Sequence, residues 1–216
     1  MMLVTIVVGS GIAAQRMSHD AGLQLLENAA VTALGLGVLI FVLGPVSGAH
    51  FNPLVSVADW ALGRRSRSGL TPSDLAGYVV AQTSGAILGA VLANAMFGLR
   101  WVTWSAHDRS AFHLLSGEVV ATAGLLFVIV ALVRSHRASQ AHWVVASYIG
   151  AAYWFTSSTS FANPAVTVGR VFSNTFAGIA PASMPLFLIV QWVGATIGVG
   201  LACFLFPPRR SDQVRS

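Results

Sequence analysis

The sequence contains no lysine, few charged residues and a single cysteine. All twelve basic residues of the 216-residue chain are arginines, and charged residues make up 9% of it, against about 25% in soluble domains. Hydrophobic residues make up 55%, and the mean hydropathy is +0.73. The composition therefore predicts an integral membrane protein rather than a soluble domain. With Cys203 as the one cysteine, an intrachain disulfide is excluded.

Motifs for catalysis and for nucleic-acid binding are also missing. The arginines form no stripe with interleaved aromatic residues, so nucleic acid is not predicted as a partner. We find no nucleophile with a neighbouring base and no phosphate-binding glycine loop, so an enzyme, a cofactor and a metal site are not predicted. His50 has no histidine or cysteine at ligand spacing, which favours a packing or cavity-facing role over metal binding.

Six apolar runs predict six membrane-spanning helices with short connections. The runs cover residues 1–14, 29–46, 75–97, 114–133, 143–155 and 186–206. The first run is shorter than the roughly 20 residues of a full crossing. Either the chain starts late or its true start lies upstream. We expect one transmembrane domain over residues 1–216, with an apparently truncated first span.

The arginines predict the orientation of the chain. Eight of the twelve follow the second, fourth and sixth runs: Arg64, Arg65, Arg67, Arg134, Arg137, Arg209, Arg210 and Arg215. Loops rich in arginine stay on the cytoplasmic side. These ends are therefore predicted to be cytoplasmic, and so is the N-terminus if the first run crosses.

Two motifs recur at nearly one offset and indicate an internal repeat. The Asn-Pro pairs at Asn52 and Asn163 are 111 residues apart (163 − 52), and the motif QxxGAxxG at Gln82 returns at Gln191, 109 residues on (191 − 82). Each half, about 1–98 and 112–206, holds three runs, so the halves are expected to be inverted in the membrane. The glycines of the second motif are predicted helix-packing sites: Gly85, Gly89, Gly194 and Gly198.

The segments that begin with Asn-Pro, residues 52–62 and 163–172, are too short to span a membrane. We predict two half-helices whose N-termini meet near the midplane, with proline in the first turn and asparagine as the N-cap. Each asparagine NH₂ would be left free to donate to a passing solute. The predicted midplane residues are Asn52, Pro53, Leu54, Asn163, Pro164 and Ala165.

The irregular stretches before the half-helices are expected to line a water-filled path with backbone carbonyls, because unpaired backbone groups survive at membrane depth only in such places. This carbonyl ladder is predicted at Gly48, Ala49, His50, Phe161 and Ala162. Carbonyl acceptors, two asparagine donors and two positive helix ends suit small neutral solutes and repel cations.

These motifs resemble those of the major intrinsic protein family, the aquaporins and aquaglyceroporins. The resemblance rests on SGAHFNPL at 47–54, FANPA at 161–165, the AQxxGAxxGA pattern at 81–90 and Glu118 at the start of the fourth run. It implies an all-α bundle of six spans and two re-entrant half-helices, a homotetramer with one pore per subunit, and passive flow across a bacterial inner membrane. Glu118 is then expected to accept hydrogen bonds from loop N–H groups rather than to relay protons.

Three departures from the family pattern bear on function. Leu54 replaces an alanine and would put a larger side chain beside the midplane constriction. No glutamate equivalent to Glu118 precedes Gly9, which would leave the first half-helix less supported. Val166 stands where the family has its filter arginine. Carried over position by position, the filter is predicted at Thr32, Ala151, Ser160 and Val166.

Arg170, one helical turn beyond Val166, offers two alternatives. It could supply the missing charge, or it could pair with a loop carboxylate or extend to the membrane surface. Arginine side chains near helix ends commonly do the latter, and the sequence favours it.

The small filter side chains predict a wide, mildly polar constriction that passes glycerol-like polyols and urea as well as water. Bacterial relatives with valine at this position resemble arsenic-associated aquaglyceroporins, which adds neutral or methylated arsenicals as candidate solutes. Two alternatives stay open. A non-conducting homologue is compatible with the short first run and Leu54, and a secondary transporter would need coupling carboxylates beyond Glu118.

Overall fold

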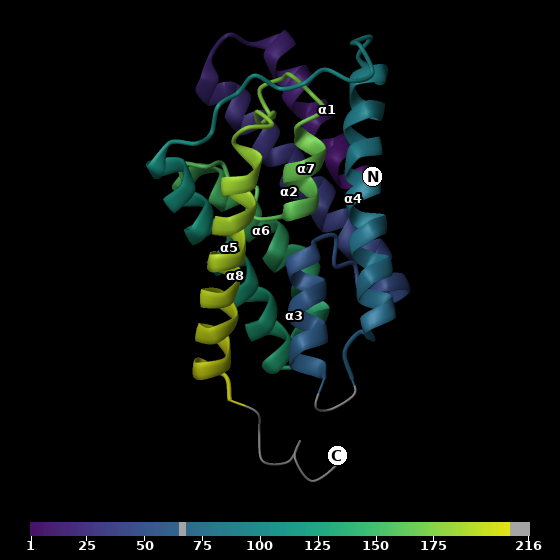
Figure 1. The fold of residues 1–216 in the computed structure, drawn as a ribbon, viewed down its shortest axis with the longest axis vertical. Coiled ribbons are helices and arrows are strands. Elements are labelled where there is room, and N and C mark those ends of the chain that lie inside the picture. Colours follow the sequence, from purple (N-terminus) through teal and green to yellow (C-terminus); the bar gives the residue numbers. More distant parts are fainter. Residues whose placement is uncertain (65–67, 208–216) are drawn as a thin grey trace.

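The computed structural model describes residues 1–64 and 68–207, which form an upright bundle of helices (Figure 1). The α-helices are α1 (Met2–Met17), α2 (Ala21–Ser47), α3 (Pro53–Gly63), α4 (Pro72–Met96), α5 (Phe112–Arg134), α6 (Ala141–Phe155), α7 (Pro164–Arg170) and α8 (Met184–Leu205), with a short 3₁₀ helix at Ala138–Gln140. The predicted all-α fold with two half-helices is confirmed.

Four helices of the described residues are long and apolar enough to cross a membrane: α2, α4, α5 and α8. The helix α1 is apolar but has 16 residues, and α6 has 15. Large apolar side chains such as Leu34, Phe41 and Phe204 point outward with more than half of their surface exposed. This outward apolar surface is what a lipid-facing bundle requires, so the prediction of a membrane protein is confirmed.

The helices α2 and α4 begin earlier than the apolar runs because polar residues cap them. The carboxylate of Asp20 accepts a hydrogen bond from the Leu23 N–H at 2.7 Å, so α2 starts eight residues before the predicted run. Thr71 and Asp74 form a reciprocal capping box at the start of α4. Such caps satisfy the free N–H groups of the first helical turn. The apolar run therefore marks the membrane-buried part of a helix and not its full length.

One pair of helices packs closely in each half of the chain. The helix α1 packs against α4, and α5 packs against α8, the teal and yellow helices that run side by side in Figure 1. A Cβ atom at Gly89 would meet the Met1 carbonyl, and one at Gly198 would meet the Ala123 carbonyl. The glycines thus let the helix backbones approach closely. The chain begins beside α4 at about half the height of the bundle (Figure 1).

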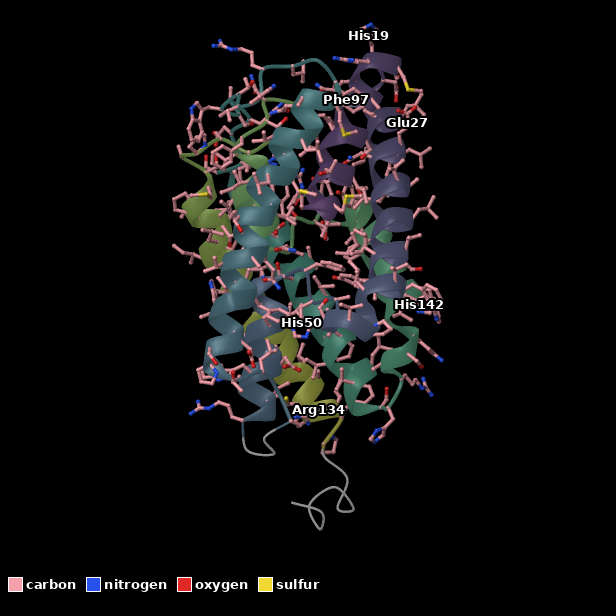
Figure 2. All side chains as sticks on the ribbon, turned by 90° about the vertical axis from the view of Figure 1, so that its right-hand side faces the viewer. His19, Glu27, His50, Phe97, Arg134 and His142 are labelled. Carbon is pink, nitrogen blue, oxygen red and sulfur yellow. The ribbon has the colours of Figure 1, made fainter. Side chains whose placement is uncertain are left out.

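The half-helices α3 and α7 lie one above the other in the bundle (Figure 1). The helix α7 ends at Arg170, two residues earlier than predicted, because the chain tightens into a turn in which the Phe172 N–H donates to the Gly169 carbonyl at 3.2 Å. Figure 2 shows Arg134 at one end of the bundle and His19, Glu27 and Phe97 at the other. We call the second the outer end, following the predicted orientation. Arg65, Arg67, Arg209, Arg210 and Arg215 lie outside the described residues.

Candidate pore

The two half-helices are joined at their N-termini by a reciprocal pair of hydrogen bonds. The Nδ2 of Asn52 donates to the carbonyl of Ala162, and the Nδ2 of Asn163 donates to the carbonyl of Phe51, both at 2.7 Å. Each asparagine therefore binds the loop that precedes the other half-helix. This changes the expectation that both NH₂ groups are free. Because an amide NH₂ carries two N–H donors, one of each pair is used for the bridge.

The side-chain oxygens of the same asparagines cap the half-helices. The Oδ1 of Asn52 accepts from the Leu54 N–H at 3.0 Å, and the Oδ1 of Asn163 accepts from the N–H groups of Ala165 and Val166 at 3.0 and 3.2 Å. Pro53 and Pro164 occupy the first helical position, where no N–H is needed. Each asparagine thus caps its own half-helix and forms a hydrogen bond to the other half of the chain.

The loops before the half-helices share an unusual backbone. Ala49 and Phe51 have φ values of 48° and 50°, and Ser160 and Ala162 have φ values of 50° and 48°. The offset between these pairs is 111 (160 − 49 and 162 − 51), the same as between the asparagines. Non-glycine residues rarely adopt the left-handed region, and the surroundings must hold them there. The repeat seen in the sequence therefore extends to the backbone conformation.

A buried carboxylate holds the second loop. Glu118 on α5 accepts hydrogen bonds from the N–H groups of Phe161 and Ala162, at 3.2 and 2.5 Å. Gln191 on α8 donates to Glu118 at 2.7 Å and to the Thr167 hydroxyl of α7 at 2.8 Å. A single carboxylate thereby holds two consecutive loop residues, of which Ala162 has the left-handed backbone, and, through Gln191, the half-helix that follows them.

The first loop is held by a neutral network instead. The Ser56 hydroxyl of α3 receives a hydrogen bond from the Nε2 of Gln82 at 3.0 Å and lies 3.1 Å from the Nδ1 of His50. The His50 ring packs on Tyr78 with 5.3 Å between ring centroids. The first half-helix therefore has support of its own, although no glutamate on α1 supplies it.

A cavity of about 1310 Å³ runs beside both half-helices, from Arg64 and Arg134 at the inner end to Arg170 at the outer end. Of the predicted site residues, it is lined by Gly48, Ala49, His50, Asn52, Asn163, Thr32, Ser160, Phe161 and Val166. Figure 2 shows His50 within the bundle, nearer to the end with Arg134 than to the end with His19. Ala162 does not line the cavity. It is fully buried, and its carbonyl accepts the hydrogen bond from Asn52.

Ala151, a predicted filter residue, lies elsewhere. Its side chain is exposed on the outward face of α6, whereas Ile149 and Tyr153 of the same helix line the cavity. The Tyr153 hydroxyl donates to the Thr32 hydroxyl on α2 at 3.4 Å. Ala151 is therefore not part of the cavity lining, which in this part of α6 includes the large aromatic side chain of Tyr153.

Leu54 does not narrow the cavity either. Its side chain is 2% exposed and packs in the core between α3, α5 and α8, while Val55 lines the cavity. Ala165 is equally buried in the second half. The expected effect of Leu54 on the width of the path is therefore absent.

Arg170 corrects a further expectation. Its side chain is 2% exposed, so it does not extend to the membrane surface. Its guanidinium lies 3.4 Å from the centroid of the Phe161 ring, and its Nε donates to the carbonyl of Ala177. Arg109 faces the same ring at 4.8 Å. The outer end of the cavity thus contains a buried cation, whereas the sequence favoured an Arg170 side chain at the membrane surface or paired with a loop carboxylate.

The charges of Arg109 and Arg170 affect the pKa of His107 in the outer loop. Burial lowers the pKa of His107, and the positive charges of Arg109 and Arg170 lower it further. The imidazole is therefore held in its neutral form at pH 7. His107 therefore adds no charge to those of Arg109 and Arg170.

Two half-helices joined tip to tip beside a long cavity, within a bundle of apolar helices, define a helical membrane channel. The chain belongs to the major intrinsic protein family, since the family model described as "Major intrinsic protein" matches residues 1–162. The match ends one residue before Asn163, so the second half-helix is recognised from the hydrogen bonds and backbone angles that it shares with the first.

Relatives of the chain include aquaporins and an aquaglyceroporin. It is 46% identical to Aquaglyceroporin AqpS of Rhizobium meliloti over 97% of this chain and 87% of that protein. It is 29% identical to Aquaporin Z of Photorhabdus laumondii over 82% of each, and 33% identical to Aquaporin NIP1-2 of Arabidopsis thaliana over 62% of this chain and 47% of that one. These similarities support a channel for water and small solutes.

Proposed function

We propose that the channel passes glycerol-like polyols and urea together with water, passively and in both directions. The observation that carries this proposal is the mixed lining of the cavity. Asn52, Asn163 and Ser160 present polar groups, while Val166 and Ile149 present apolar ones. A polyol has a hydroxyl edge and a hydrocarbon edge, so it can exchange its hydration for both kinds of contact.

Val166 is the residue on which the proposed solute range depends. It lines the cavity one turn above Asn163, where a family member with arginine would place a charged side chain. An apolar side chain at this level leaves room for a solute larger than water. The likeness to a protein named aquaglyceroporin supports the same range.

Stopped-flow light scattering on proteoliposomes tests the proposal. Liposomes with the wild-type protein should shrink quickly in an impermeant osmolyte and re-swell quickly in glycerol or urea. Val166→Arg should slow glycerol and urea re-swelling by about tenfold or more while water flow persists, because the longer, charged side chain narrows the path. Val166→Ile is the matched control, since it changes size without adding charge.

The outcome separates the alternatives. Absence of water and glycerol flux above that of empty liposomes, from folded wild-type protein, would favour a non-conducting homologue. Flux that saturates and follows an ion gradient would favour a secondary transporter.

Neutral or methylated arsenicals belong to the same proposal, because neutral metalloid hydroxides resemble glycerol in size and in their hydroxyl groups. Cells that express the protein should take up more methylarsenite than control cells, and uptake equal to the control would remove this solute class. We further propose a homotetramer in a bacterial inner membrane. The native mass in detergent, measured by light scattering, tests the assembly.

A further inference from the structure

Arg170 shares one face of α7 with Val166. The two residues are four positions apart, which puts their side chains on the same side of a helix. Both line the cavity. Four residues of α-helix rise about 6 Å, and helical side chains lean back toward the N-terminus of the helix. The Arg170 side chain is therefore directed from the outer end of α7 toward the level of Val166.

The surrounding structure fixes the position of this side chain. The guanidinium stacks on the Phe161 ring at 3.4 Å, and its Nε is bound by the Ala177 carbonyl. Phe161 is itself packed edge-on against Phe187, with 5.2 Å between ring centroids. A guanidinium held by a ring and a carbonyl cannot swing freely out of the cavity wall.

The contacts of Arg170 leave its charge in place. A carbonyl and an aromatic ring are neutral partners, so they orient the guanidinium without cancelling it. Arg109, on the same ring, adds a second positive charge and donates to the Gly178 carbonyl at 2.9 Å. The buried carboxylate of Glu118 is directed at the N–H groups of Phe161 and Ala162.

We propose that Arg170 is the specificity-determining cation of the outer constriction, displaced by one helical turn from the position that Val166 occupies. It rejects cations and leaves room for neutral solutes beside Val166. The proposal rests on the proposed function, because it concerns the selectivity of that same path. A channel can thus have valine at the family's arginine position and still exclude cations by charge.

The size of the effect follows from electrostatics. A unit positive charge about 6 Å from a second cation, at the effective dielectric of protein sites, lowers the occupancy of that cation by roughly 100-fold. The positive ends of the half-helices add to this repulsion but are common to all variants of Arg170. The contribution of Arg170 is therefore measurable by removing its charge.

Urea and guanidinium are a suitable pair of solutes, because they have nearly the same planar shape and differ by one charge. We would measure exchange of radiolabelled urea and guanidinium in proteoliposomes, at equal concentrations on both sides so that no membrane potential develops. The variants are Arg170→Met, which removes the charge at similar length, and Arg170→Lys, which keeps it. Arg16→Met is the control, since Arg16 lies at the outer end but outside the cavity lining, bound to the Phe97 carbonyl.

The expected result is a change in the ratio of guanidinium to urea exchange. The wild type should exchange urea roughly 100-fold faster than guanidinium. Arg170→Met should raise the ratio of guanidinium to urea exchange by about tenfold or more, Arg170→Lys by less than about threefold, and Arg16→Met should leave it at the wild-type value. Adding Val166→Arg to Arg170→Met should restore the exclusion of guanidinium.

Two results would overturn the Arg170 proposal alone. A folded Arg170→Met protein that still exchanges urea and keeps the wild-type ratio would refute the role of Arg170 but leave the proposed function intact. A wild-type protein that exchanges guanidinium nearly as fast as urea would refute it without any variant. Wild-type liposomes that exchange no urea would instead contradict the proposed function, and the Arg170 proposal with it.

Discussion

Asn52 and Asn163 each donate a hydrogen bond, at 2.7 Å, to the loop that precedes the other residue's half-helix. The two repeats of the chain are thereby locked together at the point where their helix ends meet. Because each side-chain oxygen is used for capping, the bridge and the cap depend on different atoms of the same residue. A substitution that spares one function and removes the other can therefore separate them.

Asn163→Asp is such a substitution. Aspartate is as good an N-cap as asparagine, so α7 should still form, but the Nδ2 donor to the Phe51 carbonyl is lost and a negative charge enters the cavity wall. We expect glycerol flux to fall by about fivefold or more, or cation leak to rise. Stopped-flow re-swelling and a pH-sensitive dye inside the liposomes measure the two effects. Asn52→Asp should have the same effects. If glycerol flux and cation leak both stay at their wild-type values, the hydrogen bonds between the two half-helices are not needed for conduction.

Glu118→Gln tests the support of the second loop. The carboxylate accepts hydrogen bonds from Phe161, Ala162 and Gln191, whereas a glutamine would turn an NH₂ toward some of these donors. A buried donor left without an acceptor costs about 1–3 kcal/mol. We expect the melting temperature in detergent to fall by about 5 °C or more, together with solute flux.

The control for Glu118→Gln is Asp20→Asn. Asp20 caps α2 at an exposed site, and asparagine caps equally well, so the melting temperature should stay within about 1 °C of the wild type. If Glu118→Gln melts like the wild type, the left-handed residues of the loop do not depend on this carboxylate.

Gly198→Ala tests the close approach of α8 and α5. An added Cβ would meet the Ala123 backbone, and helix backbones in contact cannot give way as a flexible side chain can. Overpacking of this kind costs about 1–3 kcal/mol, and the melting temperature should drop by roughly 2–10 °C. Gly200→Ala, where a Cβ would meet open space, should not lower it. Equal melting temperatures of the two variants would show that α5 and α8 can move slightly apart without loss of stability.

The sequence predicts the fold well because the features that determine it are local and repeated. The Asn-Pro pairs and the glycine motif each specify one piece of backbone, and their common offset of about 110 residues relates the two halves. The left-handed residues Ala49 and Ser160 follow the same offset, but their residue types do not predict a left-handed backbone. Alanine and serine have no intrinsic preference for this conformation, so the structure around the loops must hold them in it.

The lining of the cavity is harder to predict, for two physical reasons. The helix α6 is apolar on its lipid face, its core face and its cavity face, so no polar stripe shows which side chains turn inward. Ala151 and Tyr153 could therefore not be distinguished from the pattern. Arginine poses the second difficulty, since its long side chain can reach either the surface or the interior. Only the position of the Phe161 ring and the Ala177 carbonyl decides the direction of Arg170.

Tyr153 lines the cavity where the sequence predicted Ala151, so its ring is expected to limit the size of the solutes that pass. Tyr153→Ala removes a large ring and its hydrogen bond to Thr32, and should let a longer polyol such as xylitol through about as readily as glycerol. Tyr153→Phe keeps the ring and should keep the wild-type size limit. Ala151→Val, on the outward face of α6, should change neither flux. Re-swelling of proteoliposomes in glycerol and in xylitol gives the ratio of the two fluxes for all three variants. If this ratio changes in Ala151→Val but not in Tyr153→Ala, then Ala151 and not Tyr153 lies in the cavity wall.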